Sequence, residues 1–325
     1  MPTVQTVRGP VETGRLGVTL VHEHLNFRSI GGQALAKHVD LNREYQYRLI
    51  QDAVNVGVNT IVDCGPFPDV PETQKLAERF PQLNIVLSTG AYLESLVPDT
   101  VKNLTEDQMV AHMVKNITKG YEGFEKTGVK AGIIKVAGNK SVLTEWEKKN
   151  FRAAARVQRE THVPIVTHAC AGAREQMEIL REHGANVAAT FYSHVEAEFG
   201  WDGRTKEQEA EYLADVARAG GYLHFNNFDF SWDTPFADMV YLINHLESHG
   251  FGEKILFSID VNWTVDDEGR IWHEAQREHP EAGKRTYAYA ITHAAPMLMA
   301  AGVSLQRIWT YLVDNPRRYF EAAAR

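Results

Sequence analysis

The sequence predicts an α/β fold, a (β/α)8 TIM barrel formed by the whole chain, residues 1–325. Short apolar, β-branched runs recur about every 34 residues, enough for one strand, one helix and two loops. These runs are almost continuously hydrophobic instead of alternating, as expected for parallel strands covered on both faces. No low-complexity linker divides the chain, so we expect a single domain.

Eight strands are expected in chain order. They cover Gly17–Val21, Val58–Asp63, Ile85–Thr89, Gly132–Val136, Pro164–His168, Ala189–His194, Gly221–Asn226 and Lys254–Ile259. Eight strands that alternate with helices are typical of a closed parallel barrel. A doubly wound sheet is the alternative, but it usually carries a glycine-rich fingerprint after its first strand, where this chain has His22-Glu23-His24.

Segments with helical periodicity occupy most of the intervals between these strands, and further ones occupy the C-terminal region. The expected helices are Glu44–Gly57, Thr105–Gly120, Thr144–Thr161, Glu207–Gly220, Phe236–Gly250, Tyr287–Ala301 and Ser304–Asp314, with a last short helix from Pro316. Thr105 with Gln108 and Thr144 with Glu147 have the spacing of capping boxes, and several ranges end at glycine. The stretch from about Val261 to Lys284 is expected to be an irregular active-site loop.

Composition excludes several classes of protein. Hydrophobic residues make up 44% of the chain and charged residues 23%, which excludes wholesale disorder. The net charge of −8 argues against a nucleic-acid partner. The start lacks a basic segment followed by an apolar run, and no apolar stretch approaches the ~20 residues of a membrane span. We therefore expect a cytoplasmic protein with no membrane partner.

Histidine and cysteine numbers restrict the kind of metal site. The chain has 14 histidines and only two cysteines, Cys64 and Cys170, which we expect to be reduced core thiols. Any metal ligands should therefore be imidazole and carboxylate groups instead of thiolates.

Polar side chains occur at the C-terminal ends of the expected strands, where the active site of a barrel is built. They are His22 and His24 after the first strand, Lys135 in the fourth, His168 in the fifth, His194 in the sixth and Asp260 after the eighth. Residues two apart on a strand point to the same side, so His22 and His24 can face one point. A single histidine at a strand end is more often a hydrogen-bonded core residue, but the ordered set favours a metal site.

Lys135 and Asp260 each allow more than one interpretation. Lys135 lies in an apolar strand, where a buried ammonium group needs a partner. It could form an ion pair, act as a Schiff-base lysine of lowered pKa, or be carboxylated by CO2 to a carbamate that bridges two cations. Asp260 could cap the following segment, or bind a metal and accept a proton from metal-bound water.

These segments resemble the phosphotriesterase family of the amidohydrolase superfamily over nearly the whole chain, including its lactonase-like and phosphotriesterase-related members. The matching segments are Thr6–Pro10, Thr19–His24, Ala131–Ala137, Pro164–His168, Ser193-His194, Ser258–Asp260 and Asn315-Pro316. The resemblance implies a binuclear metal centre of two divalent ions, with zinc as first choice and Mn, Co or Fe fitting the same ligands. His22, His24 and Asp260 would hold the buried ion, His168 and His194 the exposed one, and a carboxylated Lys135 and a hydroxide would bridge them. The resemblance also implies a homodimer.

Two departures from the family pattern bear on mechanism and substrate. The Asp–His proton relay of phosphotriesterases has no clear counterpart, because Phe228 occupies the histidine position; Glu196, Glu198, Asp229 and His224 are the candidate substitutes. Tyr92 matches the tyrosine that lactonase-like members place near the substrate carbonyl, but the arginine those members carry after the seventh strand is missing.

We therefore expect a metal-dependent hydrolase that cleaves a lactone or related carboxyl ester, with Asp260 and Tyr92 as catalytic residues and phosphotriester hydrolysis as a side activity. Attack would come from the bridging hydroxide. The alternatives are an N-acyl amide hydrolase, a Schiff-base lyase using Lys135 and a ligand-binding barrel without turnover.

Aromatic residues in the expected mouth loops predict a small-molecule substrate with a hydrophobic part. Among them we expect Phe27, Tyr92, Phe228 and Trp263 to contact it. We assign no role to the histidines on helices and outer loops, which include His245 and His249.

Overall fold

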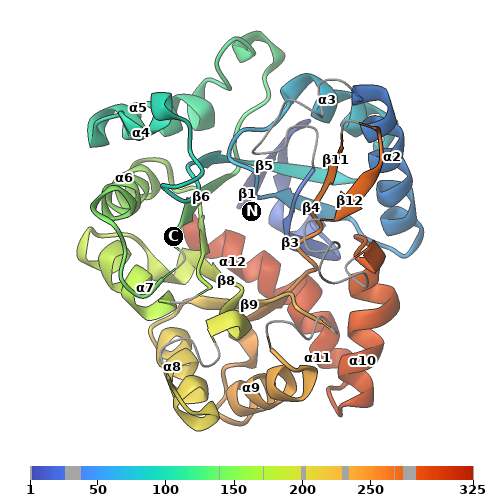
Figure 1. Ribbon diagram of the computed structural model, residues 1–325, viewed down its shortest axis with the longest axis vertical. Coiled ribbons are helices and arrows are strands. Elements are labelled where there is room, and N and C mark those ends of the chain that lie inside the picture. Colours follow the sequence, from blue (N-terminus) through green and yellow to red (C-terminus); the bar gives the residue numbers. More distant parts are fainter. Residues whose placement is uncertain are drawn as a thin grey trace.

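The computed structural model describes residues 2–25, 38–138, 140–170, 172–198, 203–228, 234–266, 268–273 and 283–324. All eight expected strands are present in these ranges, and each pairs in parallel with the next along the chain. They are β3 (Thr19–Glu23), β4 (Thr60–Asp63), β5 (Asn84–Gly90), β6 (Ile133–Ala137), β7 (Ile165–His168), β8 (Thr190–Ser193), β9 (Tyr222–Phe225) and β10 (Ile255–Phe257). Together they form the nearly closed barrel of Figure 1, which confirms the predicted (β/α)8 fold.

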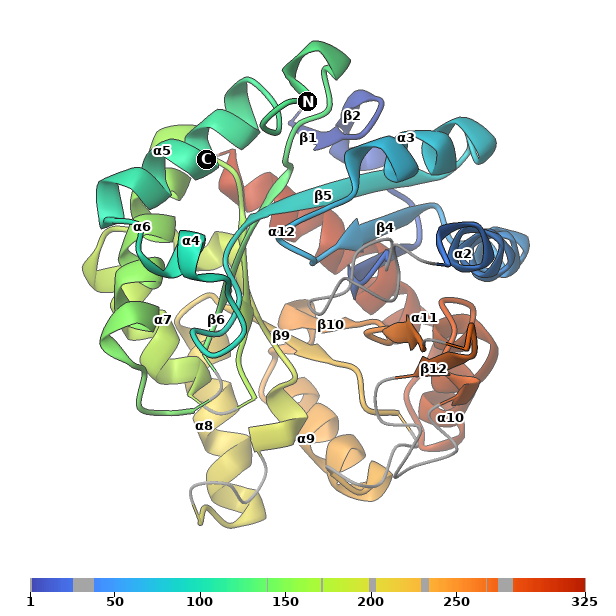
Figure 2. The same cartoon turned by 45° about the horizontal axis from the view of Figure 1, so that its top comes forward.

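A ring of helices surrounds the barrel, as Figure 2 shows. In the described residues it includes α2 (Val39–Asn55), α3 (Val70–Arg79), α4 (Asp99–Lys102), α5 (Glu106–Thr118), α6 (Glu145–Thr161), α7 (Ala173–Glu182), α8 (Lys206–Arg218), α9 (Phe236–Ser248), α10 (Ala295–Ala300), α11 (Leu305–Trp309) and α12 (Asn315–Ala323). The capping boxes predicted at Thr105 and Thr144 are both formed, with reciprocal bonds to Gln108 and Glu147. No described helix is long and apolar enough to cross a membrane.

Three helices, α3, α4 and α7, were not among the expected ranges. Asp69 caps the N-terminus of α3: its carboxylate accepts a hydrogen bond from the backbone N–H of Glu72, and Pro71 stands in the first turn. Both features are start signals that can be read from a sequence. The α7 helix follows Gly172, which has a φ of +98° and offers no capping side chain, so its sequence carries no such signal.

Two hairpins correct the expected topology. The chain begins with an antiparallel pair, β1 (Thr3–Thr6) and β2 (Gly9–Glu12), which was not predicted. The stretch expected to be irregular after the last barrel strand contains a second pair, β11 (Trp263–Val265) and β12 (Ile271–His273). Trp263 anchors this second hairpin, because it is buried and its indole N–H donates to Asn42 Oδ1 of α2 at 2.8 Å.

The lumen of the barrel is a packed apolar core. Its members from the strands are Val21, Val62, Val86, Ile133, Val166, Phe191, Tyr222 and Leu256. Tyr319 of α12 belongs to the same cluster, and its hydroxyl donates to the carbonyl oxygen of Ile165, the first residue of β7. The aromatic ring therefore fills the end of the barrel where the strands begin, and the polar cluster described next lies at the opposite end.

Side chains join the first barrel strand to the last, because the ladder stops between β3 and β10. The fully buried carboxylate of Glu23 accepts hydrogen bonds from the backbone N–H groups of Ile259 and Val261, at 2.9 and 2.7 Å. Ser258 Oγ donates to the carbonyl oxygen of His22 at 2.9 Å. These bonds explain why β10 ends at Phe257, two residues before the expected end.

Candidate metal centre

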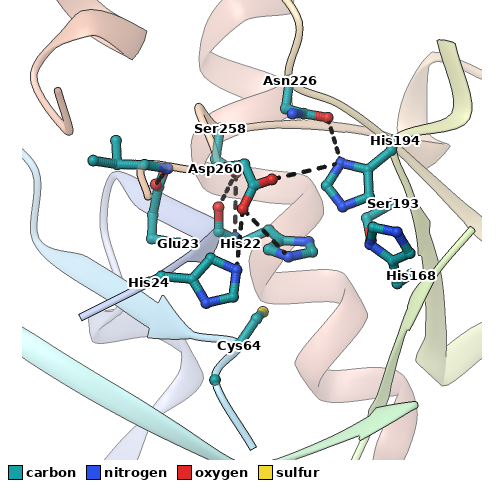
Figure 3. A network of polar contacts seen from close by, with 12 residues as sticks. His22, Glu23, His24, Cys64, His168, Ser193, His194, Asn226, Ser258 and Asp260 are labelled. Carbon is teal, nitrogen blue, oxygen red and sulfur yellow. Dashed lines mark hydrogen bonds and ion pairs between the residues drawn. The ribbon is translucent and has the colours of Figure 1, made fainter. Parts of the chain in front are cut away.

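The six side chains predicted from the strand ends come together at one end of the barrel. His24 Nε2 lies 3.2 Å from Asp260 Oδ1, and His22 Nε2 lies 3.7 Å from the same oxygen (Figure 3). The ring of His194 is 4.8 Å from that of His22 and 4.6 Å from that of His168, measured between centroids. Residues from β3, β7, β8 and β10, far apart in the sequence, thus converge on one point.

Unusual backbone geometry directs two of these side chains into the cluster. His194 has a φ of +64° and Asp260 a φ of +56°. Among the described residues, only one other residue besides glycine, His162, has a positive φ. This left-handed conformation costs roughly 1–2 kcal/mol for a residue with a Cβ, and such strain is found mainly at functional sites. Both residues immediately follow a barrel strand or its extension, so the turn points each side chain over the barrel mouth.

Lys135 extends into the cluster from β6. Its side chain is fully buried, and Nζ lies 3.3 Å from His22 Nε2. Burial lowers the pKa of this amine, and no carboxylate of the described residues forms an ion pair with it. The structure therefore does not favour the ion-pair interpretation of Lys135. Gly90 of β5 is needed beside it, because a Cβ there would collide with the Lys135 carbonyl oxygen.

Burial also controls the charge of three of the four imidazoles, whereas Asp260 raises the pKa of His24 against the effect of burial. Burial lowers the pKa of His22 and His168 well below the usual value, and neighbouring positive charges add to the effect. The pKa of His194 falls to about 4 for the same main reason. A neutral imidazole is the form that binds metal ions. At neutral pH these three rings are therefore ready to act as ligands without first losing a proton.

The donor set fits divalent cations. One ligand atom each from His22, His24 and Asp260 lies within 4.8 Å of the other two. His22 Nδ1 is buried without a hydrogen-bond partner among the described residues, which is costly unless another group uses it. Imidazole nitrogens with a carboxylate oxygen are the ligands of zinc and of other first-row divalent metals. Residues 22, 24 and 260 can thus hold one ion, with His168 and His194 beside them.

A second layer of polar contacts, which the sequence analysis missed, fixes the orientation of His194. Asn226, just after β9, contacts His194 Nδ1 through its Oδ1 at 2.8 Å. One oxygen of the buried Glu196 carboxylate accepts the backbone N–H groups of Asn226 and Asn227 at 2.8 and 2.7 Å. Arg285 Nη2 donates to Asn227 Oδ1 at 2.8 Å. The sequence offered one sign of a role for Asn226, namely its position at the end of an expected barrel strand.

Glu196 and His224 were candidate substitutes for the missing proton relay. The Glu196 contacts above hold a loop backbone. His224 is fully buried in β9, stacks on His22 at 5.3 Å and contacts Ser258 Oγ through Nε2 at 2.7 Å. It therefore lies under the cluster. The side chain of Glu198 and residue Asp229 are outside the part of the chain that the structure describes.

Tyr92 and Cys170 both contact His168. The Tyr92 hydroxyl lies 3.4 Å from His168 Nδ1, and Cys170 Sγ lies 3.2 Å from Nε2. Cys64 is fully buried, as expected, but the expectation of a core thiol is wrong for Cys170, which is only half-buried. Its position two residues after His168 carries it to the rim of the barrel.

The predicted substrate-contacting aromatics differ in their surroundings. Phe228 is fully buried, with its ring 5.3 Å from that of Phe257 in the hydrophobic core. Trp263 is also buried, in the second hairpin. Phe27 lies outside the described residues. Of the three described residues, Tyr92 is the one that lies beside the polar cluster, and substrate contact by all four stays a prediction.

Comparisons with known proteins agree with this arrangement. The sequence model of the phosphotriesterase family matches residues 2–320. The phosphotriesterase homology protein of Mycobacterium tuberculosis is 28% identical, over 99% of this chain and 98% of that protein. An aryldialkylphosphatase of Saccharolobus solfataricus is 27% identical over 95% and 96% of the two chains. An N-acetyltaurine hydrolase of Xenopus tropicalis is 24% identical over 97% of each.

The fold has a solved counterpart. The crystal structure of the phosphotriesterase homology protein of Escherichia coli superposes with a TM-score of 0.77 at 22% identity, covering 94% of this chain and 99% of that one. The family match spans nearly the whole sequence, from the first hairpin to the last helix. The chain belongs to the phosphotriesterase family.

Proposed function

We propose that this chain is a hydrolase that uses two divalent metal ions to cleave a lactone or a related carboxyl ester. The observation that carries the proposal is the convergence of four imidazoles, one carboxylate and one buried amine at the mouth of the barrel. His22, His24 and Asp260 would hold one ion, and His168 and His194 the other. Zinc is our first choice, and Mn, Co or Fe would fit the same ligands.

Lys135 would be shared between the two ions as a carbamate. Its lowered pKa favours the neutral amine, which is the form that adds to CO2. The nitrogen forms a bond to the CO2 carbon and loses a proton, leaving an anion with two oxygens. This change would turn a neutral amine into the anion that two cations require, which a Schiff base would not supply, and it therefore favours the carbamate over the Schiff-base interpretation.

The remaining roles follow from position and charge. Two bound ions would polarise the substrate's carbonyl oxygen and lower the pKa of a water molecule. Asp260 stays ionised because neighbouring imidazoles lower its pKa well below the usual value, against the effect of burial. It can therefore accept the proton released during attack and return it to the leaving group. Tyr92, whose hydroxyl lies beside His168, would donate a hydrogen bond to the substrate.

Metal analysis combined with a hydrolysis screen tests this function. We expect about two ions per chain at the mouth of the barrel, activity lost on chelation and restored by zinc, and fastest turnover of lactones or carboxyl esters. Faster cleavage of phosphotriesters than of lactones would contradict the substrate assignment. Borohydride trapping of Lys135 by a carbonyl substrate, with activity in metal-free protein, would instead establish a Schiff-base lyase.

An N-acyl amide hydrolase is the second candidate. It is favoured by the similarity to the N-acetyltaurine hydrolase of Xenopus tropicalis over 97% of each chain. Amide cleavage needs the same donor set, but it depends more on protonation of the leaving nitrogen, a step that Asp260 could serve. An N-acyl amide panel with matched ester analogues separates the two candidates, because the ester-to-amide rate ratio reports which leaving group the site protonates.

A further inference from the structure

A second group of metal-binding side chains lies outside the barrel, between α8 and α9. It consists of Glu211 on α8 with His245 and His249 on α9. One ligand atom from each lies within 4.8 Å of the other two. The two helices are neighbours in the outer ring in both Figure 1 and Figure 2. This cluster therefore shares no residue or barrel strand with the centre at the barrel mouth.

The two histidines are spaced to chelate one ion. Residues four apart lie on the same face of a helix, and the rings of His245 and His249 stack at a centroid distance of 4.1 Å. His249 Nδ1 lies 2.8 Å from the carbonyl oxygen of His245. Because a carbonyl oxygen only accepts, this contact places a proton on Nδ1 and leaves Nε2 as the nitrogen available to a metal ion, which is how metal-bound histidines are commonly oriented.

Glu211 completes the set from the neighbouring helix. Its Oε1 lies 3.1 Å from His245 Nε2, yet that nitrogen is buried and lacks a hydrogen-bond partner among the described residues. The two atoms are therefore close without being aligned for a hydrogen bond. Adjacent ligands of a tetrahedral zinc ion, each at ~2.0–2.1 Å from the metal, are themselves about 3.3 Å apart. Their spacing is thus already that of two ligands on one ion.

We propose that Glu211, His245 and His249 bind a third divalent transition-metal ion, of which zinc is the representative, and that this ion fastens α8 to α9. Two imidazoles and one carboxylate leave one tetrahedral position for water. The half-buried His245 supplies the fixed ligand, and the exposed Glu211 and His249 close on the ion with small side-chain rotations. The site stabilises the folded state, because the unfolded chain cannot hold the three ligands together.

Zinc occupancy of the full-length, metal-loaded protein tests the proposal. The chain is equilibrated with buffered micromolar Zn2+, and bound zinc is counted for the wild type, His249→Ala and Glu211→Gln. His293→Ala is the matched control, because His293 is another exposed histidine on a helix, outside the cluster. We expect one equivalent less zinc in His249→Ala and Glu211→Gln than in the wild type and in His293→Ala. We also expect a zinc-dependent rise in Tm of a few degrees that His249→Ala reduces.

Equal zinc content and an equal Tm rise in all four proteins would overturn the proposal. An equal loss in His249→Ala and His293→Ala would also overturn it, because it would show adventitious binding to surface imidazoles. The result is independent of the proposed hydrolase function. Asp260→Asn alters the barrel centre and should still lose one zinc equivalent when His249→Ala is added.

Discussion

The two histidine clusters of this protein are built in opposite ways. The centre at the barrel mouth gathers side chains from residues 22 to 260, all on or just after parallel strands, and His22, Lys135 and His194 among them are buried. The cluster on α8 and α9 takes two of its three ligands from one helical turn and leaves Glu211 58% exposed. The first can exist only when the whole barrel is closed, whereas the second needs a single contact between helices. Chemistry should therefore depend on the first cluster and local stability on the second.

Asp260→Asn should give the largest effect, because it removes both a proposed metal ligand and the proposed proton acceptor. We expect kcat/KM to fall about 10³-fold on the best ester substrate, within the range for loss of a general acid–base group. Circular dichroism should show an unchanged fold. Activity within tenfold of the wild type would contradict the role of Asp260 in the reaction.

His273 gives a third environment for an imidazole, buried but outside both clusters. Burial lowers its pKa to about 4, and its Nε2 contacts the Tyr45 hydroxyl at 3.1 Å. The unfolded chain binds a proton near pH 6.5, whereas the folded one does so near pH 4. The stability from the neutral ring is therefore complete above about pH 6.5 and is lost as the pH falls towards 4, by up to about 3 kcal/mol.

The difference in unfolding free energy between the wild type and His273→Gln isolates this group from other titrations. Denaturant unfolding at pH 7, 5.5 and 4.5 should show that the free energy of unfolding of the wild type falls relative to that of His273→Gln as the pH falls. A constant difference across this range would show that burial does not hold the ring neutral.

Glu23→Gln tests whether the central cluster depends on barrel closure. The substitution keeps the shape of the side chain but places an amide N–H2 group against one of two backbone donors. We expect the free energy of unfolding of the metal-free protein to fall by about 2 kcal/mol, measured by denaturant titration. Glu211→Gln, the same substitution in the exposed cluster, is the control and should change it by less than about 0.5 kcal/mol. Equal effects would remove the contrast drawn between the two clusters.

Asn226→Ala should have a smaller effect on activity, because Asn226 acts through His194. Loss of a group that orients a metal-bound histidine typically costs 10–100-fold. We expect about tenfold here, since the Asn226 bond to His194 is between neutral groups. The zinc affinity of the barrel centre should fall by a similar factor. Asn226→Asp keeps the accepting oxygen and should restore most of the affinity, which a purely structural role of Asn226 would not predict.

The contrast between the clusters also explains what the sequence could reveal. His22 and His24 have the two-residue period of a strand, and Lys135, His168, His194 and Asp260 lie at the ends of other expected strands, so the grouping of these side chains was predictable from strand positions, while their division between two ions came from the family resemblance. Asn226 was not found, because an asparagine that contacts a histidine 32 residues away leaves no periodic signal. The closure of the barrel by Glu23 was also hidden, since it pairs residues 236 and 238 positions apart.

The outer cluster was missed for a related reason. His245 and His249 show the helical four-residue spacing, but Glu211 joins them only through the packing of α8 on α9. The burial of Phe228 likewise could not be read from its position at the end of a barrel strand, where mouth and core residues alternate. Contacts within an element and the meeting of side chains at the strand ends of a barrel were thus predictable, while contacts that depend on how helices and loops pack were not.

Substitutions in the outer cluster should have the smallest effect on catalysis. Glu211→Gln and His249→Ala together should change kcat/KM by less than twofold, because α8 and α9 contribute no side chain to the barrel centre described above. The measurement is steady-state hydrolysis of the best ester at saturating zinc. A loss of tenfold or more would show that the α8–α9 contact controls the segment after β9, where Asn226 orients His194. In that case the two clusters would be coupled through the loop that Glu196 holds, and the outer ion would regulate the reaction as well as stabilise the fold.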